Sequence, residues 1–496
     1  MDHYYDFSGF RSVCYSLINL MVKGKESLVL KFKTGVLTMD LKNKKVLVVG
    51  LATTGIPLVT VLKKLGGKVV ITDTKSGKDL KETTERLNLN ADELLLGYQL
   101  KNIEEAGNPE LVIVSPGVPM EIPLILDAKN KGIEVIGEIE LAYRLMKGHL
   151  IAITGTNGKT TTTALTGEIF KNEKIRTHVV GNIGVPMISK VLDATEEDFF
   201  ITEVSSFQLE SVKSFKPEVA AILNLTPDHL NRHKTMNNYT LCKMNIFTNQ
   251  GADNTAVINY DDLVLRKLTL NLSSNKVYFS RLQQLDKGVF IKDGKITIRS
   301  KGKEIEVIDK QQLKILGEHN VENALAATAI AWSMDIKVDS IRKGLINFLG
   351  VEHRMEVCGK VKGVTFINDS KGTNPDASIK AVEAVKDPII LLAGGMDKGS
   401  NFEELIDLFP GRVKHLVLYG ETASIIEKTA HQKGYLNTIV FNDLEAAAKF
   451  AFDKGEEGDV ILLSPACASW DMYSSYEKRG EHFKEIFEKL RVMFHD

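Results

Sequence analysis

The sequence predicts an α/β protein with three domains, each built on a mostly parallel sheet. The chain has 496 residues, which fits three domains of about 150 residues or two large ones. Apolar runs of strand length alternate with helical stretches along most of the chain, as they do where helices join parallel strands. These runs fall into three separate series, so we expect one sheet from each series.

Composition and charge exclude several other classes of protein. Lys and Arg total 63 against 64 Asp and Glu, a net charge of −1, whereas a nucleic-acid-binding protein would carry a basic excess. The 43% hydrophobic and 26% charged residues are typical of a folded chain, and no apolar run reaches the roughly 18 residues of a membrane span. The four cysteines form no CxxC pair, which excludes a disulfide scaffold and a cysteine-rich zinc site. We therefore expect a cytoplasmic protein with no nucleic-acid partner and no membrane span.

Residues 1–38 precede the regular pattern. Residues 12–22 are apolar enough for the core of a secretion signal, but acidic residues precede them and no small-residue cleavage site follows. Met39 stands directly before the first clear strand and fits a native start. We treat residues 1–38 as an extension of unknown role. The expected domains are residues 39–145, 146–350 and 351–496.

The first series predicts a Rossmann-like N-terminal domain. Residues 45–50, 68–73 and 111–117 fit strands, and residues 56–66 and 122–132 fit helices. The run Gly-Leu-Ala-Thr-Thr-Gly after the first strand resembles a dinucleotide fingerprint, which raises an NAD-dependent oxidoreductase as one alternative. Ala52 argues against that alternative, because the fingerprint has a glycine there to let the backbone approach pyrophosphate closely.

The second and third series of expected strands differ in their hydrophobic pattern. The central strands are expected at residues 149–155, 199–203 and 219–225, and the short alternating segments in 270–312 predict a small antiparallel part. The third series is expected at residues 364–369, 389–395, 415–420, 438–443 and 460–466. It predicts a second Rossmann-like domain at the C-terminus.

A glycine-rich loop joins the first central strand to a helical run at residues 162–171. It consists of Gly155, Thr156, Asn157, Gly158, Lys159, Thr160 and Thr161. Glycines let backbone N–H groups curl around phosphate oxygens, the lysine bridges the terminal phosphates, and Thr160 supplies an oxygen to Mg²⁺. Ile153 stands where the general GxxxxGK[ST] pattern has glycine, so the loop is a shortened form. We therefore expect a central domain of the P-loop ATPase type.

Polar residues at the ends of two further central strands are candidate metal ligands. Glu203 ends the strand at 199–203, with Ser205 and Ser206 beside it, and His229 follows the strand at 219–225. Both belong at the carboxyl edge of the sheet, where α/β proteins bind ligands. We expect both to lie near the phosphate loop.

A series of motifs resembles the Mur ligases, ATP-dependent enzymes that add amino acids to the peptidoglycan precursor. In chain order they are GTNGKTTT (155–162), GNIG (181–184), EVSSFQLE (203–210), TPDHL (226–230), GEHNVEN (317–323), HR (353–354), NDSKGTN (368–374), GGMDKG (394–399) and SPACASWD (464–471). The resemblance covers about residues 40–496. SPACASWD, GGMDKG and the N-terminal VVGLATTG resemble the branch that adds D-glutamate to UDP-N-acetylmuramoyl-L-alanine.

The resemblance implies a reaction and its cofactors. ATP phosphorylates a substrate carboxylate, and the incoming amine attacks the acyl phosphate to give an amide and phosphate. Such chemistry needs cations that bring two anions together. The resemblance implies ATP and two Mg²⁺ sites, and its metal ligands are Thr160, Glu203, His229 and Lys243. In this family a lysine four residues after a tyrosine, here Tyr239 and Lys243, is carbamylated.

The resemblance also implies site residues in all three domains. The catalytic residues are Lys159, Glu203, His229, Lys243 and Lys371. ATP is bound by the phosphate loop (Gly155 to Thr161), Asn320, Asn323, Arg354 and Asp369. The UDP substrate is bound by Thr53, Thr54, Thr74, Lys75, Ser115, Asn182 and His229, and D-glutamate by Thr373, Lys398, Ser469 and Tyr476. Tyr476 departs from the family pattern, which commonly has phenylalanine there.

Several alternatives stay open from the sequence. They are another Mur ligase that adds L-alanine, a diamino acid or a dipeptide; a folylpolyglutamate synthase-like ligase, which would lack the UDP-type first domain; and a P-loop binding or motor protein without an amino-acid acceptor. Cys467 has no His/Asp constellation around it in sequence, so we expect it to pack in the core. We expect a monomer that acts on small molecules.

Overall fold

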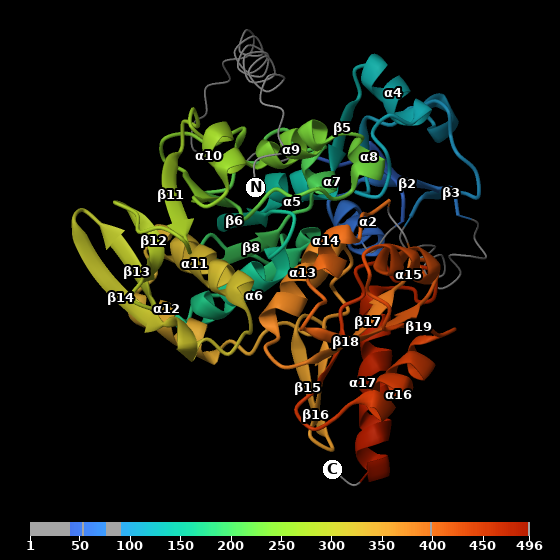
Figure 1. Cartoon of the computed structure of the whole chain (residues 1–496). Coiled ribbons are helices and arrows are strands. Elements are labelled where there is room, and N and C mark those ends of the chain that lie inside the picture. The colour runs from blue at the N-terminus through green and yellow to red at the C-terminus, as the bar shows by residue number, and fades with distance from the viewer. Residues whose placement is uncertain (1–39, 52–53, 76–90, 397–398, 495–496) are drawn as a thin grey trace, which may run out of the picture. The chain divides into compact units, whose positions relative to one another are not determined.

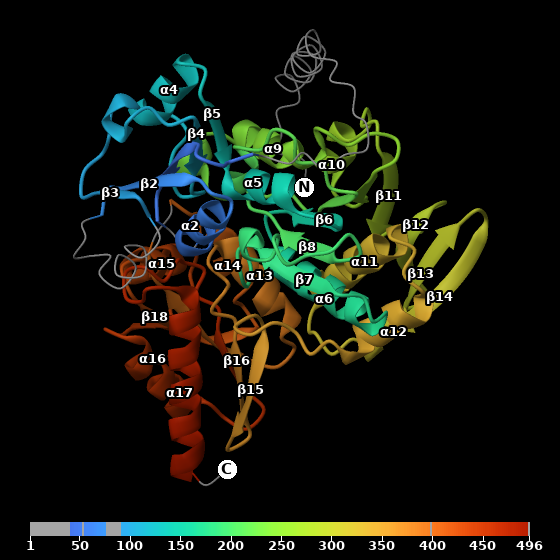
Figure 2. The same cartoon turned by 180° about the vertical axis from the view of Figure 1, so that it is seen from behind.

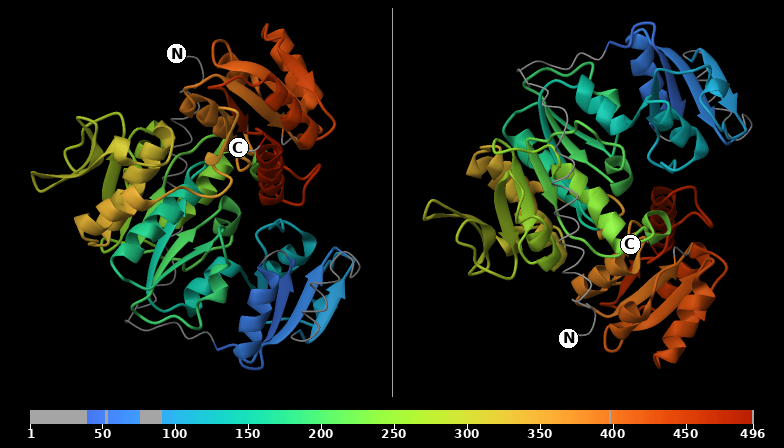
Figure 3. Two further views of the ribbon diagram at one scale, coloured as in Figure 1. Left: turned by 90° about the horizontal axis from the view of Figure 1, so that it is seen from below. Right: turned by 90° about the horizontal axis from the view of Figure 1, so that it is seen from above.

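The computed structural model describes residues 40–51, 54–75, 91–396 and 399–494, which belong to one compact unit, Met39–Asp496. Three sheets follow one another along the chain, with helices on their faces (Figure 1). Figure 3 shows that each sheet comes from one stretch of the chain, coloured blue to cyan, green to yellow, and orange to red. No helix within the described residues is long and apolar enough to cross a membrane.

The N-terminal sheet has five parallel strands in the order β3-β2-β1-β4-β5. They are β1 (Lys45–Val49), β2 (Lys68–Asp73), β3 (Glu93–Leu96), β4 (Leu111–Val114) and β5 (Glu134–Gly137). Because successive strand side chains alternate between faces, Val46 and Val48 pack with α2 (Gly55–Lys64), and Leu47 packs with α4 (Pro123–Asn130). This strand order confirms the Rossmann-like prediction.

The central sheet has nine strands in the order β14-β13-β12-β11-β10-β9-β6-β8-β7. They are β6 (His149–Thr154), β7 (Thr177–Gly181), β8 (Phe199–Glu203), β9 (Val219–Ile222), β10 (Thr255–Asn259), β11 (Asn275–Ser280), β12 (Gly288–Lys292), β13 (Lys295–Ser300) and β14 (Lys303–Asp309). Strands β6 to β12 pair in parallel, and β13 and β14 add antiparallel strands at one edge. The predicted antiparallel part is confirmed, and it extends the central sheet.

The two faces of the central sheet carry different helices. Ile151 and Ile153 of β6 pack with α6 (Lys159–Asn172), α11 (Glu318–Ser333) and α12 (Val338–Asn347). Leu150 and Ala152 of the same strand belong to the core that includes residues of α5 (Glu138–Leu145), α9 (Met236–Met244) and α10 (Leu263–Leu268). Figure 2 shows these two groups of helices on opposite sides of the sheet. Gly344 of α12 is required by the contact with α6, because a Cβ there would lie 2.7 Å from the Cα of Ile169.

The C-terminal sheet has six strands in the order β15-β16-β20-β17-β18-β19, of which β15 alone is antiparallel to its neighbour. They are β15 (Glu356–Val361), β16 (Val364–Asn368), β17 (Ile389–Gly394), β18 (Val413–Tyr419), β19 (Thr438–Val440) and β20 (Val460–Leu463). One face packs on α13 (Pro375–Ala384), α14 (Glu403–Asp407) and α15 (Ala423–Gln432), and the other on α16 (Leu444–Lys454) and α17 (Tyr476–Phe494). This layering confirms the second Rossmann-like prediction.

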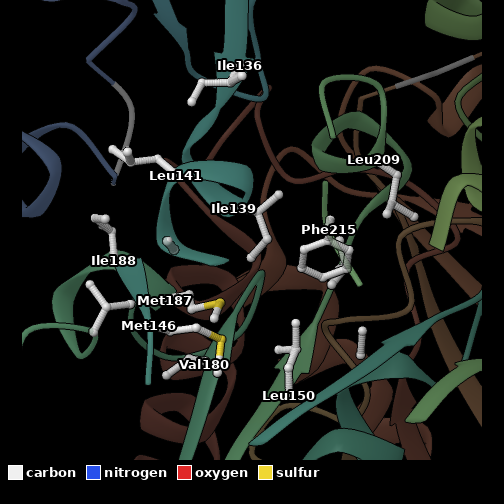
Figure 4. Close-up of a cluster of buried hydrophobic side chains, with 14 of the residues drawn as sticks. Ile136, Ile139, Leu141, Met146, Leu150, Val180, Met187, Ile188, Leu209 and Phe215 are labelled. Atoms are coloured by element: carbon white, nitrogen blue, oxygen red, sulfur yellow. The ribbon is translucent and has the colours of Figure 1, made fainter. Parts of the chain in front are cut away.

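An apolar cluster joins the first two sheets. Figure 4 shows Leu141 near Ile188 and Ile139 near Phe215, and Ile136, Met187 and Leu209 belong to the same cluster. The shorter elements of the described chain are η1 (Glu104–Ala106), η2 (Met187–Ser189), α7 (Ser206–Leu209), α8 (Leu230–His233), η3 (Asn245–Phe247) and η4 (Lys310–Gln312).

Glu138 is buried in the apolar cluster that joins the first two sheets, and its Oε1 accepts a hydrogen bond from the Ile188 N–H at 2.8 Å. Burial raises the pKa of Glu138 to about 7.

We predict that Glu138 makes stability fall as the pH rises. The raised pKa means that the folded chain binds more protons than the unfolded chain between pH 4.5 and about 7, so the free energy of unfolding decreases by about 3 kcal/mol across that window. Glu138→Gln should remove this decrease, as measured by urea unfolding at pH 5 and pH 8.

Glu140, two residues further along α5, is the matched control. It is also buried, but three N–H groups from Lys213, Ser214 and Phe215 and the Arg144 guanidinium donate to it. These donors outweigh burial and lower the pKa of Glu140, so Glu140→Gln should destabilise the protein at pH 8. Equal pH dependence in Glu138→Gln and the wild type would contradict the prediction.

Candidate active site

The phosphate loop links the end of β6 to the start of α6. Gly158 caps the helix with φ +85°, and a Cβ there would lie 2.3 Å from Oδ1 of Asn323, so glycine is required. Asn224 fixes the loop from the next strand end, since its side chain accepts from the Asn157 N–H at 2.8 Å. The Lys159 ammonium donates to the carbonyls of Gly155 and Thr156 at 2.9 and 2.8 Å. The helix starts at Lys159, three residues before the predicted run, so its first N–H groups belong to the loop.

Glu203 lies buried at the end of β8, next to the start of the loop that follows β7. Its Oε1 accepts from the Asn182 side chain at 2.8 Å, and its Oε2 has no hydrogen-bond partner among the described residues. Burial alone would raise the pKa of Glu203. The charges of Lys371 and Lys159 and hydrogen bonds from Asn182 and Thr160 instead lower it, so the side chain is a carboxylate. A buried carboxylate that interacts with Lys159 and Thr160 of the phosphate loop fits a Mg²⁺ ligand.

Lys243 is fully enclosed beneath the phosphate loop. Its Nζ donates to the Gly155 carbonyl at 2.8 Å and to Oγ1 of Thr154 at 3.3 Å, and it lies over the ring of Tyr239. Burial and then the charge of Lys159 lower the pKa of Lys243 well below its ordinary value. Burial therefore favours the uncharged form of this amine, and an uncharged amine is a nucleophile.

A cavity of about 280 Å³ opens between the central and C-terminal sheets. It brings together seven of the predicted site residues: Lys159, Asn182, His229, Lys243, Thr373, Ser469 and Tyr476. The other lining residues are Ser205, Ser206, Phe207, Tyr239, Ala468 and Trp470. Trp470 is 64% exposed, and sequence reasoning missed it because an apolar side chain in a loop carries no distinctive pattern.

A smaller recess lies on the other side of the phosphate loop. Its lining includes the predicted Asn157, Arg354, Asp369 and Lys371, together with His319 and Lys380, which were not predicted. Asp369 accepts from Ser464 Oγ at 2.7 Å, and burial raises its pKa to about 6. Burial lowers the pKa of His319 to about 3. A neutral imidazole beside cationic side chains fits a nucleotide base or sugar better than a phosphate.

Lys371 stands between the two hollows. Its Nζ donates to the Tyr476 hydroxyl at 3.1 Å, a contact that phenylalanine could not make. Burial lowers the pKa of Lys371 to about 8, although Glu203 opposes the shift. The charge of this lysine is therefore sensitive to any anion that enters the cavity.

Asn320 and Asn323 lie buried in the first turns of α11. Asn323 Nδ2 donates to Asn320 Oδ1 at 2.9 Å, and its own Oδ1 accepts from Thr162 of α6 at 3.2 Å. The pair thus links α11 to the helix that follows the phosphate loop. Thr161, in the same helix, is also buried.

Four of the predicted residues of the N-terminal domain lie at the carboxyl edge of its sheet, and none of these four lines the large cavity. Thr54 starts α2, Thr74 and Lys75 follow β2 at the surface, and Ser115 follows β4, where its hydroxyl donates to the Gly50 carbonyl at 2.7 Å. Asp73, which ends β2, accepts from the N–H groups of Leu51 and Lys75 at 2.7 and 2.9 Å. Thr53 and Lys398 lie outside the described residues.

Arg479 is an anchoring residue that the sequence did not reveal. It is fully buried on α17, and its guanidinium donates to the carbonyls of Ser370 at 2.8 Å, Cys467 at 3.2 Å and Ala468 at 3.3 Å. It thereby fastens the loop that carries Lys371 and Thr373 to the loop that carries Ser469. Cys467 is buried there, as predicted, and packs in the C-terminal core.

The fold and the site define an enzyme that binds a nucleotide at a phosphate loop and shares its reaction cavity with a second domain. The chain matches the Mur ligase MurD-like N-terminal domain over residues 44–137, the Mur ligase middle domain over 153–331 and the Mur ligase glutamate ligase domain over 353–467. The protein belongs to the Mur ligase family.

Curated relatives match over their whole length. The chain is 56% identical over 454 residues to UDP-N-acetylmuramoylalanine--D-glutamate ligase of Alkaliphilus oremlandii (strain OhILAs), with 91% of this chain and 100% of that protein covered. It is 47% identical over 455 residues to the ligase of the same name from Clostridioides difficile (strain 630), with the same coverage.

Solved structures of related ligases share the fold. UDP-N-acetylmuramate-alanine ligase MurC from Thermotoga maritima aligns with a TM-score of 0.56 at 20% identity, over 90% of this chain and 100% of that chain. MurF ligase from Thermotoga maritima in complex with ADP aligns with a TM-score of 0.57 at 20% identity, over 86% and 96%.

We predict that Arg479→Met lowers the free energy of unfolding by about 3 kcal/mol or more, because it leaves several buried carbonyls without a donor. Urea unfolding measures the loss. Arg491→Met is the matched control, since Arg491 lies on the same helix, is 48% exposed and pairs only locally with Glu488. Similar losses in the two variants would contradict the anchoring role of Arg479.

Proposed function

We propose that this protein is an ATP-dependent amide ligase that joins D-glutamate to UDP-N-acetylmuramoyl-L-alanine, in cytoplasmic peptidoglycan precursor synthesis. The observation that carries the proposal is the cavity that unites Lys159 of the phosphate loop with Thr373, Ser469 and Tyr476 of the C-terminal domain. A phosphate donor and an amino acid can meet there. The relatives from Alkaliphilus oremlandii and Clostridioides difficile support this choice of substrates.

The reaction has two steps. In the first, an oxygen of the substrate carboxylate attacks the γ-phosphorus of ATP, ADP leaves and an acyl phosphate forms. The N–H groups at the start of α6 bind the phosphates, and Lys159 and Lys371 neutralise the charge of the two anions that must approach each other. In the second, the amine of D-glutamate attacks the acyl carbon, and phosphate leaves as the amide forms.

Two Mg²⁺ ions fit this chemistry. We propose that Thr160, Glu203, His229 and Lys243, the last as a carbamate, hold them. Support comes from the partnerless Oε2 of the buried Glu203 and from the position of His229 in the wall of the same cavity. When bound, Mg²⁺ would offset the negative charge of the transferring phosphate.

The carbamate at Lys243 follows from the environment of its amine. The neutral Nζ can attack the carbon of CO₂, which forms an N–C bond and releases one proton. The product is an anionic oxygen donor in a place where the amine is a poor metal ligand. The enclosed site beneath the phosphate loop supports this modification, because burial disfavours the competing ammonium form.

We assign the remaining predicted residues to three subsites. ATP is bound by Gly155, Thr156, Asn157, Gly158, Lys159, Thr160 and Thr161, with Asn320 and Asn323 toward adenine, Arg354 toward the γ-phosphate and Asp369 toward the ribose. The UDP substrate is bound by Thr53, Thr54, Thr74, Lys75, Ser115, Asn182 and His229. D-Glutamate is bound by Thr373, Lys398, Ser469 and Tyr476. We also propose that the enzyme is a monomer.

We predict that continuous ADP release over many turnovers requires both UDP-N-acetylmuramoyl-L-alanine and D-glutamate. A coupled assay for ADP, with L-alanine, L-lysine or meso-diaminopimelate in place of D-glutamate, separates this enzyme from other members of the family. Release with neither substrate would indicate a plain ATPase, and release with L-glutamate and a folate would indicate a folylpolyglutamate synthase. Either result would overturn the proposal.

Lys159→Ala is the control for this assay. Without the ammonium that bridges the phosphates, turnover should fall by at least about 100-fold, while calorimetric binding of the UDP substrate persists. Retained turnover would show that the phosphate loop is not the site of ATP chemistry.

We predict a carbamate carbon at Lys243. Protein equilibrated with ¹³C-bicarbonate should give a carbamate resonance that is absent in Lys243→Arg, whose side chain is of similar length but cannot be carbamylated. Lys171→Arg on α6, whose side chain is 62% exposed, should keep the resonance. Full activity of Lys243→Arg would contradict the assignment.

A further inference from the structure

Asp376, near the start of α13, joins the C-terminal domain to the phosphate loop. Its Oδ2 accepts a hydrogen bond from the side-chain amide of Asn157, which belongs to that loop. The same oxygen accepts from the hydroxyl of Thr226, which follows β9, at 3.2 Å. The two donors lie 219 and 150 residues away from Asp376 along the chain. One carboxylate oxygen therefore links two loops of the central domain to a helix of the C-terminal domain.

The two donors of the central domain are themselves held in place. The Thr156 hydroxyl donates to the Thr226 carbonyl at 2.9 Å and accepts from the Thr226 N–H at 3.0 Å. The Asn224 side chain accepts from the Asn157 N–H at 2.8 Å and donates to the Asn157 carbonyl at 3.1 Å. The phosphate loop and the segment after β9 thus form one hydrogen-bonded surface, and Asp376 meets that surface at both parts.

The sequence Asn-Pro-Asp at residues 374–376 fixes the carboxylate from its own side. The Asn374 side chain caps α13 by accepting from the Ala377 N–H at 2.8 Å, and Pro375 takes the first helical position. Asp376 then lies in the first turn, where a negative charge is favourable. The Asn374 amide also donates to Asp228 of the central domain at 3.4 Å. The start of α13 therefore contacts the central domain at two neighbouring residues.

A lysine on the same helix balances the charge of Asp376. The Lys380 ammonium, one helical turn further on, donates to Oδ2 of Asp376 at 3.1 Å. Both side chains are half-buried, so salt screens this pair less than it screens a pair at the surface. An unbalanced carboxylate beside the phosphate loop would repel a triphosphate. The pair with Lys380 lets an acidic side chain bind the phosphate loop without this penalty.

The segment directly before Asp376 carries residues of both hollows. Lys371 lines the smaller recess, and Thr373 lines the large cavity. Arg479 fixes this segment within the C-terminal domain, since it donates to the Ser370 carbonyl. Asp376, three residues after Thr373, ties the same segment to the central domain. The position of Lys371 and Thr373 relative to the phosphate loop therefore depends on Asp376.

We propose that Asp376 is a positioning residue for the ligase reaction, which docks the segment of Lys371 and Thr373 onto the phosphate loop. This inference rests on the proposed ligase function. The acyl phosphate forms beside the phosphate loop, and the amine approaches its carbon from the C-terminal domain, so the two domains must hold the reacting atoms in line. Asp376 takes no part in making or breaking bonds. Its effect passes through the residues that it aligns.

Two substitutions of Asp376 test this role in turnover. Asp376→Ala removes the acceptor and should lower kcat/KM for D-glutamate by about 10-fold to 100-fold, because small displacements of reacting groups cost rates of this order. Calorimetric affinity for the UDP substrate should not change, since the residues proposed to bind it lie outside the C-terminal domain. Asp376→Asn keeps an oxygen that accepts from Asn157 and Thr226, so its kcat/KM should stay within about 3-fold of the wild type.

Hydrogen–deuterium exchange of the full chain, without substrates, tests the docking itself. In Asp376→Ala the N–H groups of the phosphate loop, including that of Asn157, should exchange faster than in the wild type. A role confined to α13 would raise exchange only within that helix. Thr226→Val removes a donor from the opposite side and serves as a second variant if Asp376→Ala does not fold by circular dichroism. It should raise exchange at the start of α13.

Asp339→Ala is the matched control. Asp339 is likewise the second residue of a helix, α12, but its side chain is 79% exposed and pairs with Arg342 of the same helix. This variant should leave turnover and the exchange of the phosphate loop unchanged. Unchanged phosphate-loop exchange in Asp376→Ala, full turnover of that variant, or an equal loss in Asp376→Asn would each overturn the positioning role. Wild-type protein that forms no product from D-glutamate would instead refute the proposed function, and the exchange comparison would still decide whether Asp376 docks the two domains.

Discussion

Three lysines share one buried carboxylate at the centre of this protein. Lys159, Lys243 and Lys371 all interact electrostatically with Glu203, and burial penalises the charges of Lys243 and Lys371. Like charges in a low-dielectric interior repel strongly, and one carboxylate does not balance the positive charge of these lysines. Anions that enter the cavity relieve that repulsion, and this is the physical basis for attracting a triphosphate and a carboxylate to one place.

Hydrogen bonds that hold the backbone of the phosphate loop in place keep the site together against this repulsion. The phosphate loop bonds to Asn224 on one side, and Tyr239 donates to Thr156 at 3.1 Å from below. Carbonyls of Gly155 and Thr156 accept from Lys159 and Lys243. The amino groups of Lys159 and Lys243 are thus held by backbone oxygens, whose ability to accept hydrogen bonds does not change with pH.

The sequence predicted the features that depend on neighbours in the chain. The glycines of the phosphate loop, Glu203 at a strand end and the alternating strands of all three sheets have local signatures, and they lie where the prediction put them. Arg479 and Asp376 have none, because partners of theirs lie 109 and 219 residues away along the chain. The fold brings such groups together only after the sheets pack, so no pattern in one segment reveals them.

In the C-terminal domain, as in the phosphate loop, backbone carbonyl oxygens bind a buried basic side chain. Within the described residues Arg479 has no carboxylate at ion-pair distance, and carbonyl oxygens of Ser370, Cys467 and Ala468 solvate it instead. A carboxylate in that place would cancel the positive charge close to the amino-acid loops. A guanidinium bound only to neutral acceptors holds the two loops together and leaves its charge uncompensated. The loops that bring Thr373 and Ser469 to the cavity are therefore held by a buried cation that backbone carbonyls bind.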